Sequence, residues 1–358
     1  MGPARNAGRL FSPLDEELGL LPGELTPLLH ERLVQVGVVA KSFKAGAEVF
    51  FSFTRTPASE PTARRYTERA GAVMDECETE ASGLTPTAGD PDPRPRWVGA
   101  DGVFVRLVGG AWREVRTVSL GLVNPAQLVQ GEPRVTTSEL SYFSRLTEGA
   151  EAFIALATVE FQRRGVAQAR LVGAGSDGAD WCQRLFDRHC PAAQRSLDFY
   201  HAAERVQAFS KVLWAGCAPL AQWYAGDQLH RLKHEGPAPL LASLSAWRQA
   251  SSQPAVRAAA DAQHGFFSSR AALLDYPALR AAGLPIGTGN AESANLHVVQ
   301  DRLKGPGKFW GREHVNPMLA LRGAWCSRRW DQAWLLASKR LAAGHYPIHI
   351  FHAPKAKS

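Results

Sequence analysis

The sequence has few cysteines and no long apolar run. The five cysteines (Cys77, Cys182, Cys190, Cys217 and Cys326) form no CxxC pair, which excludes a disulfide framework and the usual zinc-site spacings. No apolar run approaches the roughly eighteen residues of a membrane span, and the first residues lack the apolar centre of a signal peptide. We therefore expect a cytoplasmic protein without a membrane partner.

The composition is that of an ordinary globular protein with an excess of positive charge. Apolar residues make up 45% of the 358 residues and charged residues 21%. There are 41 Lys and Arg residues against 34 Asp and Glu residues, which gives a formal net charge of +7 and a pI near 9.3. The length predicts two or three domains, and the charge favours a polyanionic partner over a neutral one.

Residues 1–81 are predicted to form a helical head. Thr26 and Pro27 are typical of a helix start, and residues 43–53 and 60–80 carry apolar side chains at helical spacing. The last helix places Arg64, Arg65 and Arg69 off its apolar face. This pattern favours a DNA-binding unit of the helix-turn-helix kind, with a plain bundle bearing a solvated basic face as the alternative. A Gly- and Pro-rich linker follows at residues 82–96.

Residues 97–201 carry the strand signals. Apolar runs at 97–108, 112–123 and 134–143 predict three strands, and 149–165 predicts a helix. A strand at 171–175, a helix at 179–189 and a strand at 196–200 follow. This βββαβαβ order predicts an α/β fold with a mixed sheet of the ribonuclease H-like kind.

The remaining chain reads as helical. Residues 202–285 are predicted to be an all-helical insertion, since strand signals vanish there and Ala, Leu and Trp are frequent. Residues 286–342 return to the core with a helix that carries Glu292 and then with C-terminal helices. Residues 343–358 form a short polar tail.

Four carboxylates stand beside predicted turns. Asp101 lies in the first strand, Asp177 follows the fourth, Asp198 follows the fifth, and Glu292 lies in the first turn of its helix. Carboxylate oxygens suit hard cations such as Mg²⁺, and two such ions can hold the attacking and leaving oxygens of a phosphoryl transfer. Each residue also has an ordinary explanation, because Asp is common in turns and acids are favourable at helix N-termini.

Several stretches resemble the DDE transposases of bacterial insertion sequences. They are FSPLDEELGLLPGELTP (11–27), SEPTARRYTERAGA (59–72), ADGVFV (100–105), SDGADW (176–181), LDFYHAAERV (197–206), GTGNAESANLHVVQDRLK (287–304) and ALRGAWCSRRWDQAW (320–334). The resemblance implies cleavage and strand transfer of double-stranded DNA at element ends, into target DNA, with two Mg²⁺ or Mn²⁺ ions. It also implies a homo-oligomer on DNA, in the bacterial cytoplasm and on the nucleoid.

The resemblance assigns roles to particular residues. Asp101 is the first metal-binding acid, Asp177 the second and Glu292 the third. Asp198 is the alternative second acid and is grouped with His201 in an accessory motif. Arg302, Lys304 and Lys308 are expected to hold the DNA backbone near the metals, as Arg64, Arg65 and Arg69 are in the head.

Three points stay open at this stage. Residues three apart in a regular strand face opposite ways, so Asp198 and His201 can act together only if the chain turns after Asp198. His201 would then donate a hydrogen bond to Asp198, and the pair would support the metal-binding acids without binding the metal. Longer family members carry a Cys-rich, zinc-ribbon-like segment before the first motif, whereas ten residues precede it here.

The alternative functions are a related nuclease that only cuts, and a DNA-binding derivative that has lost catalysis.

Overall fold

A five-stranded mixed sheet forms the centre of the molecule. The computed structural model describes residues 25–83, 93–129 and 131–343. The strands lie in the order β5-β2-β1-β6-β7. β1 pairs antiparallel with β2, and β2 with β5, whereas β6 is parallel to both β1 and β7. This arrangement confirms the predicted succession of three antiparallel strands followed by two parallel ones, and it is consistent with a ribonuclease H-like fold.

The core elements follow the predicted order with shifted ends. The strands are β1 (Arg96–Arg106), β2 (Trp112–Val123), β5 (Thr137–Arg145), β6 (Val172–Ser176) and β7 (Gln194–Leu197), and the crossover helices are α5 (Ala150–Arg163) and α6 (Asp180–His189). The fifth strand ends at Leu197, three residues before its predicted end. Asp198 caps a helix there, because its side chain accepts backbone hydrogen bonds from Tyr200 and His201.

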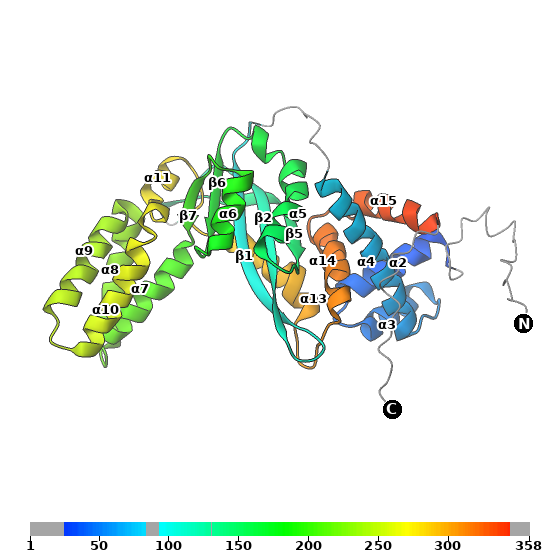
Figure 1. Cartoon of the computed structure of the whole chain (residues 1–358), viewed down its shortest axis with the longest axis horizontal. Coiled ribbons are helices and arrows are strands. Elements are labelled where there is room, and N and C mark those ends of the chain that lie inside the picture. The colour runs from blue at the N-terminus through cyan, green and yellow to red at the C-terminus, as the bar shows by residue number, and fades with distance from the viewer. Residues whose placement is uncertain (1–24, 84–92, 130, 344–358) are drawn as a thin grey trace, which may run out of the picture.

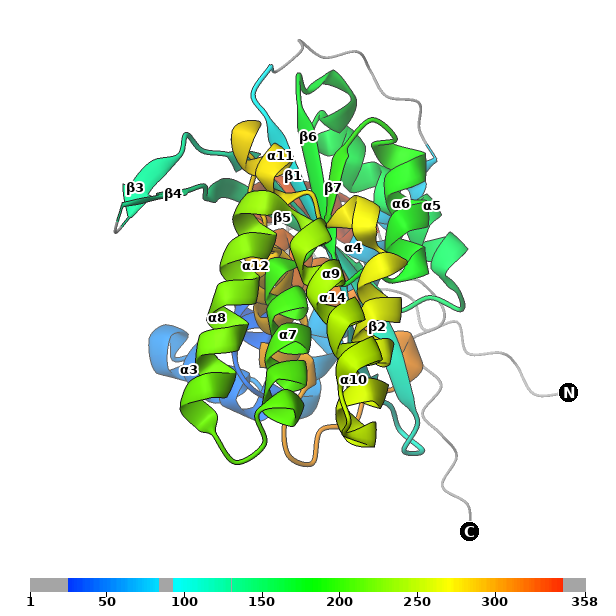
Figure 2. The ribbon, with the colours of Figure 1, turned by 90° about the vertical axis from the view of Figure 1, so that its left-hand side faces the viewer.

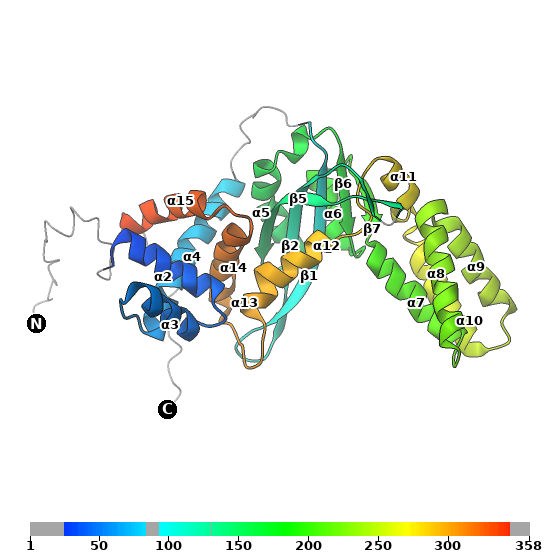
Figure 3. The same ribbon diagram turned by 180° about the vertical axis from the view of Figure 1, so that it is seen from behind.

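Helices cover both faces of the sheet. Helices α5 and α6 lie on one face (Figure 1), where Val98 and Ala100 of β1 pack against Phe153 and Leu185. On the other face a continuous helical segment crosses β1 (Figure 3). It consists of α12 (Gly289–Ala294), a π-helical stretch at Asn295–Gln300 and α13 (Asp301–Leu303). Alternate residues of β1 therefore face two different cores.

The segment predicted as an all-helical insertion consists of helices in the structure. Its helices are α7 (Phe199–Leu213), α8 (Ala218–Glu235), α9 (Pro237–Ala250), α10 (Pro254–Ser268) and α11 (Tyr276–Ala281). They extend from the β7 edge of the sheet and pack around their own apolar core (Figure 1). The insertion starts at Phe199, so His201 belongs to its first helix and not to the end of the sheet.

The N-terminal helices do not form a separate head. Helices α2 (Pro27–Val39), α3 (Phe43–Thr54) and α4 (Glu60–Ser82) share one apolar core with α14 (Arg312–Cys326) and α15 (Trp330–Ala342). The buried Arg145 of β5 also pairs with Asp75 at 2.8 Å and with Glu78 at 2.6 Å on α4. Residues 312–342, which the prediction assigned to the catalytic core, thus share an apolar core with the predicted head. Residues 1–24 of the predicted head, most of the linker and the tail from 344 lie outside the described residues.

A small hairpin leaves the sheet between β2 and β5. Its strands are β3 (Gln127–Val129) and β4 (Glu132–Arg134), and it projects sideways from the sheet in the view of Figure 2. Glu132 accepts hydrogen bonds from Lys233 of α8 at 2.9 Å and from Arg280 of α11 at 3.0 Å. The sequence prediction treated residue 134 onward as one strand and missed this arm.

Within the described ranges, no helix combines the length and the apolar character that crossing a membrane requires.

Candidate active site

Asp101 lies in the middle of β1, on the face that α12 covers. Its Oδ1 accepts the Gly102 N–H at 2.7 Å and its Oδ2 accepts the Asn295 side-chain amide at 2.7 Å. Burial raises the pKa of the Asp101 carboxyl, and the nearby charge of Asp177 raises it further, while the two hydrogen bonds and His201 oppose the increase.

Asp177 stands next to Asp101 because of the strand pairing. In the parallel β1–β6 ladder Ala100 pairs with Ser176, and Asp101 and Asp177 are the residues that directly follow this pair. Asp177 is exposed, and its Oδ1 accepts the Ala179 N–H at 2.9 Å at the start of α6. The fold thus places the first two proposed acids side by side, with Asp177 open to solvent.

Asp198 is a buried structural carboxylate. It is 0% exposed, and its Oδ1 accepts the backbone N–H groups of Tyr200 at 2.6 Å and His201 at 3.2 Å. Its Oδ2 accepts both the backbone N–H and the hydroxyl of Thr288. These hydrogen bonds join the start of α7 to the loop before α12. A side chain so fully engaged is poorly placed to bind a metal, and this geometry favours Asp177 over Asp198 as the second acid.

The expected side-chain pair between Asp198 and His201 does not form. The chain does turn after Asp198, but it turns into α7, and the bond that Asp198 accepts comes from the His201 backbone. The imidazole of His201 instead faces Glu204, with 3.6 Å between Nδ1 and the carboxylate. Because residues three apart on a helix share a face, Glu204 is the natural partner.

Glu292 lies in the first turn of α12 and is exposed. Three residues later, on the same helical face, Asn295 donates to Asp101. The helix can approach β1 this closely because Gly99 lacks a side chain: a Cβ atom there would lie 2.8 Å from the Asn290 oxygen and 3.0 Å from Ala291. Asn295 begins the π-helical stretch, a distortion that is frequent at functional sites.

The donor set has the chemistry of a divalent-cation site. Asp101, Asp177 and Glu292 supply carboxylates, and the buried Asn295 has a side-chain oxygen that accepts no hydrogen bond in the described chain. In this conformation, however, the described residues include no group of three or more Asp, Glu, His or Cys side chains gathered around one point. The residues fit Mg²⁺ by type.

One of the basic residues expected near the metals is buried. Arg302 is 3% exposed, its Nε donates to the Gly37 carbonyl at 3.1 Å, and its guanidinium stacks on Phe43 at 4.4 Å. Burial, together with the nearby charge of Arg322, lowers its pKa to about 10. The prediction that Arg302 contacts DNA is wrong in this conformation, because the residue joins the helical unit to α13.

Lys308 and Lys304 remain half-buried candidates. The Lys308 amine donates to the Arg302 carbonyl at 3.1 Å, across the loop that contains Lys308. Burial lowers the pKa of this amine. Lys304 follows α13 at the same loop. Their contact with DNA stays a prediction.

The arginines of α4 occupy different environments. Arg64 is 53% exposed and pairs with Glu68 at 2.8 Å, Arg65 is exposed and lies 5.7 Å from the Tyr66 ring centroid, and Arg69 is half-buried. The middle of α4 is buried between neighbouring helices, so its exposed residues lie in its first and last turns. The helix-turn-helix interpretation remains a prediction, and Arg64 and Arg65 are its accessible part.

The sequence analysis missed two arginines of the insertion. The guanidinium groups of Arg205 on α7 and Arg270 after α10 lie 4.2 Å and 4.3 Å from the Phe266 ring centroid. Arg270 also reaches Gly178, the residue after Asp177, since a Cβ atom there would lie 3.0 Å from its Nε. No local motif marks Arg270, because only the folding of the insertion brings it beside the Asp177 loop.

Neither a protein-family model nor a curated protein sequence matches this chain. Among solved structures, the chain is similar to the Drosophila P element transposase strand transfer complex, with 9% sequence identity and a TM-score of 0.27. The alignment covers 92% of this chain and 82% of the other. A similarity of this size is too weak to transfer fold or function.

Proposed function

We propose that this protein is a transposase of the DDE type, which cleaves DNA at the ends of an insertion sequence and joins those ends to target DNA with Mg²⁺ or Mn²⁺. The observation that supports the proposal is the position of Asp101 in β1 beside the turn that carries Asp177 directly after β6, with the helix that bears Glu292 packed on the same face of β1 as Asp101. The order of sequence motifs that resemble this family supports the same conclusion.

The proposed roles follow from position. Asp101, Asp177 and Glu292 would hold the divalent ions, which supply charge stabilisation and activate the attacking oxygen. Asn295 holds the Asp101 carboxylate in place through its amide and leaves its own oxygen as a further ligand. Arg270 reaches the Asp177 loop and would bind a DNA phosphate beside the reacting one.

The test is Mg²⁺-dependent cleavage of DNA that contains the sequences flanking the coding region. Wild-type protein should nick a supercoiled plasmid with these sequences, EDTA should prevent it, and a labelled end should join a second plasmid. Asp101→Asn, Asp177→Asn and Glu292→Gln should each abolish both reactions and leave binding to the same DNA nearly unchanged. Cleavage without joining would indicate a nuclease that only cuts.

A DNA-binding derivative without catalysis is the second candidate. It is favoured by one observation, that the carboxylates of the described chain are not gathered around one point. The same assay separates the two: under this alternative, wild-type protein binds the flanking DNA and does not cleave it with either Mg²⁺ or Mn²⁺.

A further inference from the structure

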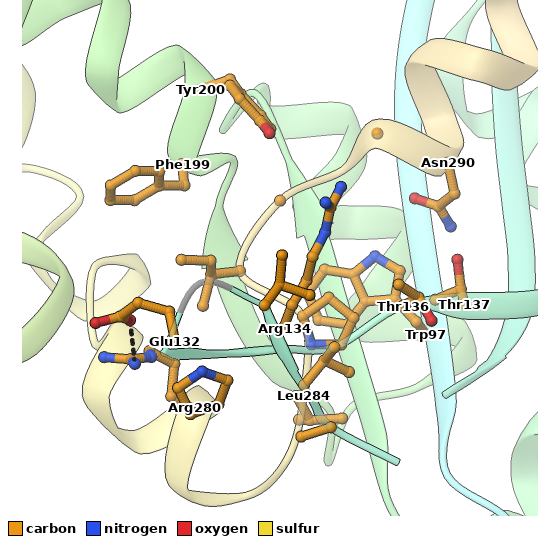
Figure 4. Close-up of a pocket in the computed structure, with 18 of the residues that line it drawn as sticks. Trp97, Glu132, Arg134, Thr136, Thr137, Phe199, Tyr200, Arg280, Leu284 and Asn290 are labelled. Atoms are coloured by element: carbon orange, nitrogen blue, oxygen red, sulfur yellow. Dashed lines mark hydrogen bonds and ion pairs between the residues drawn. The ribbon is translucent and has the colours of Figure 1, made fainter. Parts of the chain in front are cut away.

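A pocket of about 860 Å³ lies beside the candidate active site. The hairpin β3–β4 and the following residues to Thr137 form one wall, and the loop Leu284–Asn290 forms another. Trp97 lies at its base and Phe199 and Tyr200 line its rim (Figure 4). The pocket therefore exists only because the arm, the sheet and the insertion meet here.

Two buried donors of this pocket have no acceptor in the described chain. They are the indole Nε1 of Trp97, a residue that is 0% exposed, and the side-chain Nδ2 of Asn290, which is 7% exposed. The Asn290 amide orientation is set by its oxygen, which accepts the Ala291 N–H at 3.0 Å. Burying a donor without a partner costs roughly 1–3 kcal/mol, so both N–H groups favour a ligand that brings acceptors.

The two donors lie close together. Trp97 and Gly99 are two residues apart on β1 and face the same side of the sheet. Asn290 sits directly over Gly99, since a Cβ atom there would lie 2.8 Å from its oxygen. Figure 4 shows the Trp97 indole and the Asn290 carboxamide on one side of the pocket, with Thr137 near them. Both residues with unpaired donors therefore belong to the same wall of the pocket.

The surroundings select a flat, largely apolar ligand. Leu284, Pro285 and Ile286 line the pocket beside the two donors. Tyr200 is 62% exposed at the rim, where its ring can stack on an entering group. A bare phosphate is poorly suited to such an interior, whereas a nucleobase combines two aromatic faces with acceptor atoms on its edge.

The charges around the pocket suit the rest of a nucleotide. Its lining includes the three cations Arg134, Lys233 and Arg280 and the single anion Glu132. Lys233 and Arg280 both bind Glu132, which holds the arm against the insertion, while Arg134 is an exposed lining residue of the arm. A base inside the pocket would leave its phosphate at this positive rim.

We propose that this pocket binds an unpaired nucleobase of a DNA strand, with Trp97 and Asn290 donating to its edge and Tyr200 stacking on its face. The inference rests on the proposed function, because the pocket adjoins the candidate active site: Asn290 is two residues before Glu292, and Tyr200 directly precedes His201. A DNA end whose two strands have separated at the cleavage site would be held through its unpaired base.

The test compares DNA binding with and without that base. Fluorescence anisotropy in EDTA measures the affinity of full-length protein for a duplex with a short single-stranded overhang and for the same DNA with abasic overhang positions. We expect wild-type protein to bind the intact overhang about 5- to 150-fold more tightly, the range given by stacking of one base. Equal affinity for the two DNAs, with no competition by free deoxynucleoside monophosphates, would refute the proposal.

Two substitutions locate the preference. Trp97→Phe removes the indole N–H and keeps an aromatic ring, and Asn290→Asp keeps the oxygen that accepts from Ala291 and removes the donor. Each should reduce the preference for the base at least several-fold without changing the affinity for blunt duplex. Trp223→Phe is the matched control, since Trp223 is 66% exposed on α8 and does not line the pocket. A preference that survives both pocket substitutions overturns the assignment.

A crosslink in the unaltered protein covers the case in which a variant fails to fold. A 5-iododeoxyuridine at the unpaired position should crosslink to the peptide that contains Phe199 and Tyr200 or to the one that contains Trp97. Crosslinks confined to other peptides overturn the proposal. If free deoxynucleoside monophosphate competes with the DNA while the intact and abasic overhangs bind equally well, the pocket binds a free nucleotide and not a base of a DNA strand. Because binding is measured without metal, loss of the base preference is distinct from absence of cleavage, which instead refutes the proposed function.

Discussion

Replacing Asp198 by Asn should separate a structural carboxylate from a metal ligand. Asp198 accepts hydrogen bonds from the backbone of Tyr200 and His201 and, on its second oxygen, from two donors of Thr288. Asn keeps one acceptor oxygen and turns the other position into a donor. That new N–H₂ group would face the Thr288 N–H, so the contact becomes repulsive.

The structure allows the size of the effect to be estimated. A hydrogen bond to a charged group contributes about 1.5–3 kcal/mol, and breaking a buried charged network by altering one partner costs roughly 3–5 kcal/mol. For a cooperative unit of about 150–250 residues, 1 kcal/mol corresponds to roughly 2–4 °C in Tm. We therefore expect Asp198→Asn to lower the Tm by roughly 10 °C.

Asp177→Asn is the matched control for this experiment. Asp177 is exposed and accepts a backbone hydrogen bond from Ala179 at 2.9 Å, so its replacement should change the Tm by only about 1–2 °C. Differential scanning fluorimetry measures both variants, and plasmid cleavage is assayed below the lower Tm. If Asp198→Asn keeps the wild-type Tm and loses all cleavage at every Mg²⁺ concentration, Asp198 is a metal ligand and the structural interpretation fails.

Three further predictions follow from other parts of the molecule. His30 is buried between Tyr66 and Trp334, and burial lowers its pKa from 6.5 to about 4. As the pH falls, the unfolded chain therefore takes up a proton on His30 at a higher pH than the folded protein does. The free energy of unfolding should fall by about 2 kcal/mol between pH 7 and pH 5 for this reason. In urea titrations His30→Leu should remove that fall, whereas Val38→Ala in the same core should keep it. Changing Arg64 and Arg65 to Ala should reduce the slope of log K against log salt by roughly one to two units, and an unchanged slope would mean that neither residue touches phosphate. Arg270→Ala should raise the KM for DNA cleavage about tenfold or more and change the Tm by no more than about 2 °C. Arg270→Lys keeps the positive charge and should restore part of the affinity. An equal KM for the wild-type protein and both variants would exclude a phosphate contact.

The sequence by itself determined the succession of elements and the positions of the acids along it. Apolar runs and Gly- or Pro-rich breaks are local signals, so the order of strands and helices along the chain, the helical segment after the fifth strand and the positions of Asp101 and Asp177 along that order were predictable. The position of Glu292 in a first helical turn was equally local. Whether these acids bind metal remains a prediction.

Only the tertiary structure decided which polar side chains are available. Asp198 and Asp177 look alike in sequence, yet one is enclosed by the Thr288 loop and the other faces solvent. Arg302 reads as a basic residue near the site, but the N-terminal helices bury it. Burial depends on which distant segment packs over a residue, and no local pattern records that. For the same reason the pocket with Trp97 at its base, built from three separate parts of the chain, was absent from the sequence-based prediction.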